Sequence, residues 1–298
     1  MKVLVTGGTG FAGSHTARVL AGAGHDVRLL VRDAAKVRTV YEPFGNVPDD
    51  IVVGDMTDAG SADEALRGCD GVVHAAALVD LRRTAAARVE EANARGVELV
   101  VGGAASRGLP SIVHVSSLGV FFVPGGPPLS PDLPIAPGTT AYARSKAKGE
   151  VYVRRLQEQG ASIRISYPAS ILGPDDPGPS AVTEGLAASM RHAWLITSGG
   201  IQVVDVRDLA AMHLALLELP TGAHRYAAAG DMLGWSEVYQ KVCEITGTRP
   251  RGLKIPGAAL RAAGSVGLRA ADFTEAPPTR DSNSYPVKTA DHHWEHAR

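Results

Sequence analysis

The 298-residue sequence is poor in cysteine and in aromatic residues, and it carries no excess of charge of either sign. Its two cysteines, Cys69 and Cys243, lie far apart and in no metal-ligand spacing, so we expect reduced thiols rather than a disulfide or a zinc site. The 30 basic and 31 acidic residues give a net charge of -1, which provides no overall field for nucleic acid or an anionic membrane. A small molecule is therefore the expected partner.

Long hydrophobic runs are also lacking. No stretch approaches the roughly 20 uninterrupted apolar residues of a membrane span, and a glycine loop follows Met1 to Val5 so closely that it leaves no room for a signal peptide. We therefore expect a cytoplasmic protein without a membrane partner. Hydrophobic residues still make up 45% of the chain, which is enough to bury a core of one large domain or two unequal lobes.

The first half of the chain alternates short runs of Val, Ile and Leu with longer Ala-rich amphipathic segments. The expected strands are residues 2–6, 26–31, 51–53, 71–74, 112–116 and 163–167, and the expected helices are residues 11–23, 62–67, 83–107 and 142–159. This alternation is typical of the α/β class and predicts a doubly wound parallel sheet, the Rossmann fold, over residues 1–168. Right-handed crossovers would place all strand carboxyl ends, and any ligand, along one edge.

The composition changes after Tyr167. Residues 172–179 are rich in Gly and Pro and predict a hinge loop into a smaller C-terminal substrate-binding lobe, residues 169–298. In this lobe we expect strands at 201–205 and 225–228 and helices at 207–219 and 235–246. From about Ala276 the chain loses periodicity, so its histidines, His292, His293 and His296, are interpreted as parts of a solvated tail and we expect no metal site.

The glycine loop is the clearest local signal. Residues 6–13 read Thr-Gly-Gly-Thr-Gly-Phe-Ala-Gly between a strand and a helix, which favours a dinucleotide site over an ordinary Gly-rich turn. Glycines permit the tight turn and the close approach of main-chain N–H groups to a pyrophosphate, and Gly13 lets the helix pack closely. A kinase-type loop is excluded because the Gly-Lys-Ser/Thr ending is absent. The candidate cofactor contacts are Gly7, Thr9, Gly10, Phe11, Ala12 and Gly13.

The end of the second strand determines which dinucleotide is bound. An acidic residue there would hold the ribose of NAD, and a cation would hold the 2′-phosphate of NADP. The acidic position is occupied by Val31, with Arg32 next to it and Lys36 one turn further on, so NADP(H) is favoured over NAD(H). Asp33 is the competing observation, because it can either bind the ribose hydroxyls or cap the following helix.

Tyr142 and Lys146 form the candidate catalytic pair. Four residues apart on a predicted helix, they share one face, and the ammonium would favour the phenolate form of the tyrosine. Ser117 follows the fifth strand, where its hydroxyl could bind a substrate oxygen. Alone, Tyr-x-x-x-Lys is also a common pattern on surface helices; its order and spacing relative to the other motifs favour catalysis.

With these motifs assembled, the sequence resembles the short-chain dehydrogenase/reductase superfamily, in its extended branch of epimerase, dehydratase and dihydroflavonol-reductase-like proteins. The likeness spans roughly residues 1–250. It implies that Asp55 and Met56 flank the adenine, that the backbone at Ala75 to Ala77 lies close to the cofactor, and that Pro168 to Ser170 line the nicotinamide. It also favours Ser117 over Ser116 and gives Asn93 a structural or proton-relay role. The further cofactor contacts carried over are Asp55, Met56, Ala75, Ala76, Ala77, Val115, Tyr142, Lys146, Tyr167, Pro168, Ala169 and Ser170.

The resemblance implies an enzyme that reduces an aldehyde or ketone, or oxidises the corresponding alcohol, by hydride transfer with Tyr142 as acid and base. Phe121 and Phe122 replace the usual Tyr-Gly and make one pocket wall apolar, and no Asp-Glu pair follows Ser117 as sugar-nucleotide dehydratases require. A sugar-nucleotide epimerase with tightly bound NAD(P) and a non-catalytic NADP-binding sensor are the alternatives. A homodimer through the helices at 83–107 and 142–159 is also implied.

Overall fold

The computed structural model describes residues 1–80, 82–257 and 259 of the chain. Its main sheet has seven strands in the order β10-β6-β5-β4-β1-β2-β3, and all neighbouring pairs are parallel. The strands are β1 (Lys2–Thr6), β2 (Asp26–Val31), β3 (Ile51–Val53), β4 (Gly71–His74), β5 (Ser111–Val115), β6 (Ile163–Pro168) and β10 (His224–Ala228). The order of β1 to β6 confirms the predicted Rossmann fold, whose ligand edge lies where the strand order reverses, between β1 and β4.

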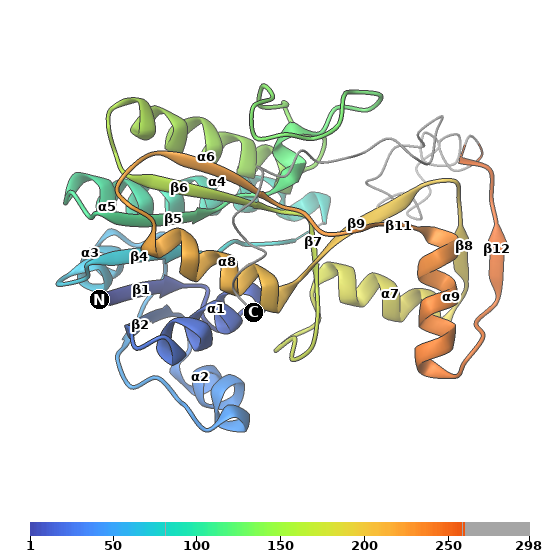
Figure 1. Cartoon of the computed structure of the whole chain (residues 1–298), viewed down its shortest axis with the longest axis horizontal. Coiled ribbons are helices and arrows are strands. Elements are labelled where there is room, and N and C mark those ends of the chain that lie inside the picture. Colours follow the sequence, from blue (N-terminus) through green and yellow to red (C-terminus); the bar gives the residue numbers. More distant parts are fainter. Residues whose placement is uncertain (81, 258, 260–298) are drawn as a thin grey trace.

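Helices cover both faces of the sheet (Figure 1). They are α1 (Phe11–Gly22), α2 (Ala34–Tyr41), α3 (Ala59–Leu66), α4 (Ala86–Gly96), α5 (Gly103–Ser106), α6 (Ala141–Glu158) and α8 (Val206–Glu218), with short turns η1 (Glu42–Phe44), η2 (Arg83–Ala85), η3 (Val97–Gly102) and η4 (Leu118–Phe121). Alternate residues of β1 point to opposite faces. Leu4 packs with α3, η3 and α6, whereas Val3 and Val5 pack with α1, α2 and α8.

Most predicted boundaries agree with the structure to within a few residues. The helix expected at 83–107 is divided into η2, α4, the π-helical η3 and α5. The helix expected after Asp33, for which no bounds were predicted, is α2. Asp33 caps its N-terminus: Oδ1 accepts a hydrogen bond from the main-chain N–H of Ala35 at 2.9 Å.

The second lobe is built from short elements. They are β7 (Ser170–Leu172), α7 (Ala181–Arg191), β8 (Trp194–Ile196), β9 (Gly200–Asp205), β11 (Met232–Gly234), α9 (Trp235–Thr246) and β12 (Gly252–Lys254). Three of these strands form the sheet β11-β9-β7, and β12 pairs with β8. Figure 1 shows this lobe extending away from the main sheet, with α9 and β12 at its far end.

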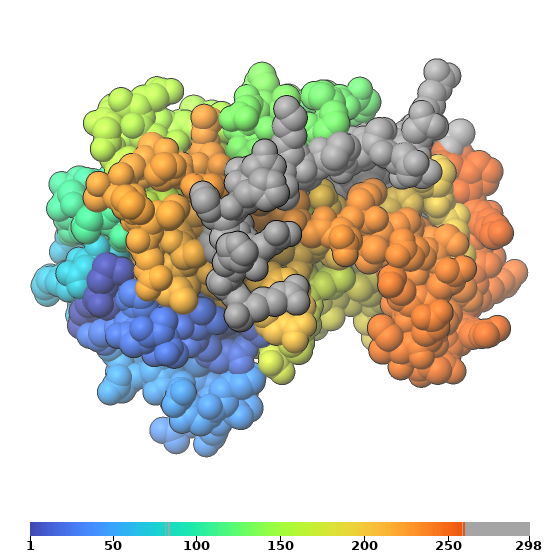
Figure 2. All heavy atoms as spheres, viewed as in Figure 1, coloured from blue at the N-terminus to red at the C-terminus, as the bar shows by residue number. Residues whose placement is uncertain are grey.

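Two elements expected in the smaller lobe belong to the Rossmann domain instead: one is a strand of its sheet and the other is a helix packed on that sheet. The strand expected at 225–228 is β10, which pairs with β6, and the helix expected at 207–219 is α8. In α8, His213 is fully buried, with its Nδ1 2.8 Å from Oγ1 of Thr16 on α1 and its Nε2 3.0 Å from Oγ of Ser166 on β6. The surface of α8 accordingly lies against that of α1 (Figure 2). Pairing between strands some 60 residues apart leaves no local sequence signal.

In the part of the chain that the structure describes, none of the helices combines the length and the apolar character needed to cross a membrane. The same residues contain no cluster of three or more histidine, cysteine or acidic side chains suited to a metal ion. The irregular tail expected from Ala276, with its histidines, lies outside the described residues.

Candidate active site

The glycine loop joins β1 to α1 at the edge where the strand order reverses. Gly7 has φ +73°, a conformation that favours glycine, and a Cβ there would lie 2.8 Å from the Cα of Ala76. A Cβ on Gly13 would overlap the carbonyl oxygen of Gly7. The main-chain N–H of Gly10 donates to that same oxygen at 2.8 Å and closes the turn. The loop is therefore compact enough for a ligand to approach its backbone.

The start of α1 fits an anionic group. Within the described part of the chain, its N-cap Gly10 provides no side-chain cap and the first turn has no acidic residue. The first N–H groups of a helix lack partners inside the helix and attract negative charge. Thr9, Phe11 and Ala12 are half-buried around this position. The residues from Gly7 to Gly13 therefore fit the pyrophosphate of a dinucleotide.

Asp33 caps α2 in the structure, as described above, through Oδ1 of its carboxylate. Arg32 and Lys36 are both exposed, just beyond the buried end of β2 at Val31. Two cations therefore lie at the position that discriminates between NADP and NAD.

The positions expected beside the adenine and the pyrophosphate lie after β3 and β4. Oδ1 of Asp55 accepts hydrogen bonds from the N–H and hydroxyl of Thr57, at 2.9 and 2.8 Å. The side chain of Met56 packs against Gly96 of α4. Ala75, Ala76 and Ala77 are half-buried, and the N–H of Ala76 donates to Oγ1 of Thr6 at 3.3 Å. Small side chains keep the backbone after β4 accessible beside the glycine loop.

The candidate catalytic pair occupies the first two turns of α6, which Thr140 caps by accepting a hydrogen bond from Ala143 N–H at 3.1 Å. The Lys146 ammonium nitrogen lies 5.8 Å from the centroid of the Tyr142 ring. It also donates a hydrogen bond to the carbonyl oxygen of Val115 at 2.9 Å. The structure thus brings together Tyr142, Lys146 and the end of β5.

Ser117 lies two residues beyond Val115 and is half-buried, whereas Ser116 is 2% exposed. The Ser117 oxygen accepts a hydrogen bond from Gly119 N–H at 3.1 Å, which leaves its own hydrogen available for donation to another oxygen. This difference in exposure agrees with the choice of Ser117 over Ser116.

Lys146 lies among other buried polar side chains, and the sequence motifs did not predict this group. Burial lowers the pKa of Lys146 to about 8, and Glu150, one turn further along α6, opposes this shift. The rings of His74 and His114 stack at 5.8 Å, on adjacent strands and in register. Burial and then the charge of Lys146 lower the pKa of His74 to about 3, and they lower the pKa of His114 as well. Both imidazoles are therefore neutral neighbours of the ammonium.

Asn93 has a structural role in this arrangement. Its amide nitrogen donates to the carbonyl oxygen of Leu78 and to Oγ of Ser145, and its oxygen accepts from Leu78 N–H at 2.6 Å. Asn93 thus joins α4 to the loop after β4 and to α6. This contact holds the two helices next to the candidate site.

The segment expected to line the nicotinamide is only partly accessible. Tyr167 is 0% exposed, and its hydroxyl donates to the carboxylate of Glu150 at 2.5 Å. Pro168 is buried, whereas Ala169 and Ser170 are half-buried. The side chain of Tyr167 belongs to the core, so only its main chain remains for the expected contact with the cofactor.

Glu150 was not predicted as a site residue, because its partner Tyr167 on β6 is distant in sequence.

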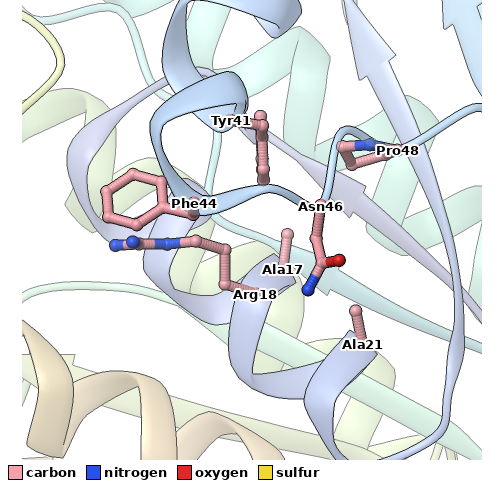
Figure 3. Close-up of a pocket in the computed structure, with 7 residues that line it drawn as sticks. All are labelled: Ala17, Arg18, Ala21, Tyr41, Phe44, Asn46 and Pro48. Carbon is pink, nitrogen blue, oxygen red and sulfur yellow. The ribbon is translucent and has the colours of Figure 1, made fainter.

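A hollow of about 190 Å³ lies between α1 and the segment from α2 to Pro48 (Figure 3). The guanidinium of Arg18 stacks 3.6 Å above the ring of Phe44 at its rim. The hydroxyl of Tyr41, another lining residue, donates to the carbonyl oxygen of Gly8 at 2.7 Å. The hollow contains none of the predicted site residues, and we interpret Tyr41 as a support for the glycine loop.

Comparison with known proteins identifies the family of the chain. A model of the NAD dependent epimerase/dehydratase family matches residues 3–228, which include the glycine loop, Ser117, Tyr142 and Lys146. The chain belongs to this family. The match covers most of the chain and supports the extended short-chain dehydrogenase/reductase resemblance seen in the sequence.

Members with assigned names include reductases. A putative dihydroflavonol 4-reductase of Synechocystis sp. is 29% identical over 251 residues, 82% of this chain and 72% of the relative. Sterol demethylase protein B of Methylococcus capsulatus is 30% identical over 262 residues, 86% of this chain and 78% of the relative. The crystal structure of gox2253 aligns with a TM-score of 0.77 and 28% identity, covering 89% of this chain and 80% of that one. The chain is therefore an enzyme of the NAD(P)-dependent oxidoreductase type.

Proposed function

We propose that this enzyme is an NADP(H)-dependent reductase of an aldehyde or ketone, which also catalyses the reverse oxidation of the alcohol. The main observation behind the proposal is the buried Lys146, which lies beside the Tyr142 ring and is bonded to the end of β5. A lysine is rarely buried without a partner or a function. A surface Tyr-x-x-x-Lys pair would leave this side chain in solvent.

The chemistry follows from three side chains. Tyr142 donates its phenolic proton to the carbonyl oxygen as that oxygen gains negative charge, and the Lys146 ammonium stabilises the resulting phenolate. Ser117 donates a hydrogen bond to the same substrate oxygen. When bound, the nicotinamide supplies the hydride for reduction or accepts it in oxidation.

The choice of NADP(H) rests on Arg32 and Lys36. Both cations are exposed at the end of β2, and neither has a carboxylate partner among the ion pairs of the described residues. The carboxylate of Asp33, the possible competitor, caps α2. A guanidinium can bind a phosphate through two hydrogen bonds, which suits the 2′-phosphate.

Partly exposed apolar side chains in the segments after β4 and β5 support a largely apolar substrate. Val79, in the loop after β4, and Val123, just after η4, are each 50% exposed, and Phe122 is half-buried between η4 and Val123. The relatives named for a dihydroflavonol and a sterol reaction agree with such a surface. The epimerases in the family's name are the second candidate class, with sugar nucleotides as substrates.

A panel assay distinguishes these classes. Aldehydes and ketones of increasing hydrophobicity are incubated with NADPH and, in parallel, NADH, and the loss of absorbance at 340 nm is followed. The proposal expects NADPH oxidation with the hydrophobic carbonyl compounds. Conversion of a UDP-sugar to its epimer without a net change in absorbance would instead identify an epimerase.

We further propose that the protein is a cytoplasmic homodimer that associates through α4 and α6. These two helices lie side by side (Figure 1), joined by ion pairs from Glu90 to Arg144 at 2.8 Å and to Lys148 at 2.7 Å. On α6, Val151 is 48% exposed beside a shallow hollow of about 270 Å³ that Ile135 and Pro137 also line. An exposed apolar position on such a face is suited to a protein contact.

A further inference from the structure

Four chemically active side chains follow one another along α6 at intervals of four residues. They are Tyr142, Lys146, Glu150 and Arg154. Residues spaced in this way lie on one face of a helix, one turn apart. Glu150 is 0% exposed and Lys146 is 8% exposed. A buried acidic residue therefore stands one helical turn from Lys146, on whose ammonium the proposed chemistry depends.

The contacts of Glu150 join three parts of the molecule. Its Oε1 accepts hydrogen bonds from the hydroxyl of Tyr167 on β6, at 2.5 Å, and from Nε of Arg154, at 2.8 Å. The Arg154 guanidinium lies 5.5 Å from the centroid of the Phe121 ring, which in turn packs 4.9 Å from the ring of Tyr167. Phe121 ends η4, the turn that Ser117 caps. Glu150 thus ties the helix of Tyr142 and Lys146 to the segment of Ser117.

Stability alone does not account for this carboxylate. Its second oxygen, Oε2, is buried and has no hydrogen-bond partner among the described residues. A buried carboxylate with incomplete hydrogen bonding costs free energy, and an apolar side chain of similar volume often serves stability better. The position of Glu150 is better explained by the effect of its charge on Lys146.

The groups around Lys146 show what that effect is. His74 on β4 and His114 on β5 are neutral, and their interaction with Lys146 disfavours any further positive charge. Tyr142 lies on the same helix. Burial lowers the pKa of Lys146, and Glu150 is the group that raises it again. On the far side of Glu150, Arg154 and the Tyr167 hydroxyl share its negative charge.

We propose that Glu150 is a positioning residue whose buried carboxylate supports the ammonium of Lys146, one helical turn away, and holds α6 in register with the Ser117 segment. The inference rests on the proposed function for the role of the ammonium. With a neutral residue at 150, Lys146 loses its proton at lower pH. The Tyr142 phenolate then loses its stabilising charge in the range where the wild-type enzyme is still active.

The test is the titration of Lys146 itself, in full-length protein labelled with 13C-lysine and observed by NMR. Lys146→Met identifies the signal by its disappearance. In Glu150→Gln, the midpoint of the Lys146 titration should fall by up to about one pH unit, because the opposite charge one helical turn away is lost. The decline of kcat for carbonyl reduction on the alkaline side should move by the same amount. Glu150→Asp, which keeps the charge, should restore both values towards wild type.

Arg154→Gln provides the opposite change. It removes the cation that competes for Glu150, so the midpoint should rise, whereas general disruption of the network would move it in the same direction as Glu150→Gln. Glu237→Gln on α9 removes an exposed carboxylate from a comparable pair with Lys241 and should change nothing. If Glu150→Gln does not fold, the Lys146 midpoints in Arg154→Gln and Glu150→Asp still test the inference.

An unchanged Lys146 midpoint in Glu150→Gln, or a fall in Arg154→Gln, overturns the inference. Failure of the proposed function is distinguishable from this result. Wild-type protein that reduces no carbonyl compound would refute the reductase assignment, while the NMR titration would still report the effect of Glu150 on Lys146.

Discussion

The ammonium of Lys146 is held 2.9 Å from the main-chain carbonyl oxygen of Val115. This bond connects the helix of the candidate acid to the strand that leads into Ser117, and it forms in the interior, where hydrogen bonds to charged groups contribute about 1.5–3 kcal/mol. The two halves of the proposed catalytic centre are therefore fixed relative to one another by the chain itself.

Tyr142→Phe should reduce kcat for carbonyl reduction by at least about 100-fold, because the substrate oxygen loses its proton donor. The affinity for NADPH, followed by fluorescence titration, should stay close to wild type. Tyr152→Phe is the matched control: it makes the same change on the same helix, where the Tyr152 hydroxyl packs against Gly102, and it should leave turnover unchanged. Full activity of Tyr142→Phe would refute the assigned acid.

Gly13→Ala should weaken dinucleotide binding at least about tenfold. The new methyl group overlaps the carbonyl oxygen of Gly7 and displaces the loop, with a loss of about 1–3 kcal/mol in the free energy of unfolding. Gly22→Ala, at the end of the same helix, places its methyl in open space and should stabilise the protein by up to about 1 kcal/mol. Isothermal calorimetry and urea unfolding measure both effects. Equal dinucleotide affinities and equal unfolding free energies in the two variants would contradict the tight packing at Gly13.

Arg32→Ala should lower the affinity for NADPH by about 10- to 100-fold, as expected for a lost charge-assisted hydrogen bond. The affinity for NADH should change little, since it lacks the 2′-phosphate. Lys36→Ala should act in the same direction with a smaller effect. Arg38→Ala, on the same helix, serves as the control. A parallel loss for NADPH and NADH would show that Arg32 does not read the 2′-phosphate.

Three of the buried histidines, His74, His114 and His213, should make the fold sensitive to mild acid. Burial lowers the pKa of His74 and His213 to about 3, and that of His114 also falls well below its ordinary value near 6.5. Below pH 6.5 the unfolded chain binds protons at these positions and the native protein does not. The contribution of these histidines to the free energy of unfolding is therefore fully present above that pH and declines as the pH falls. Each histidine contributes up to about 1.4 kcal/mol per pH unit.

Urea unfolding between pH 7 and pH 5 measures this slope. His114→Phe removes one of the three groups and should lower the slope by about 1.4 kcal/mol per pH unit. His192→Gln replaces an exposed histidine and should leave the slope unaltered. A His114→Phe protein with the wild-type slope would mean that His114 accepts a proton in the native state.

Val151→Arg should shift the protein from dimer to monomer in size-exclusion chromatography with light scattering. The substitution places a charge at the centre of the proposed α6 contact, where desolvation is costly. Ile245→Arg changes an apolar residue on α9 that is 84% exposed and should not affect association. A wild-type protein that is monomeric at micromolar concentration would refute the proposed contact.

The sequence predicted the elements whose signals are local. The glycine loop, the strands β1 to β6 and the helix of Tyr142 follow from hydrophobic period and turn chemistry within a few residues of each position. The pairing of β10 with β6 and the hydrogen bond between Tyr167 and Glu150 depend on contacts between segments that are distant in sequence. No local pattern therefore predicted them. The three-residue strand β7 was hidden at the edge of a Gly- and Pro-rich stretch.

The path of β6, β7 and α8 has a consequence for engineering. The chain leaves the main sheet after β6, returns at the junction of β9 and α8 at Asp205 and Val206, and departs again after β10. The smaller lobe therefore consists of two insertions, 169–205 and 229–257, separated by a segment that completes the nucleotide-binding body. A graft of specificity from another enzyme would need to exchange both insertions together. Cutting the chain once at 168 would remove α8 and β10 from the main body and uncover Val113, which packs with Leu216 and Leu217 of α8.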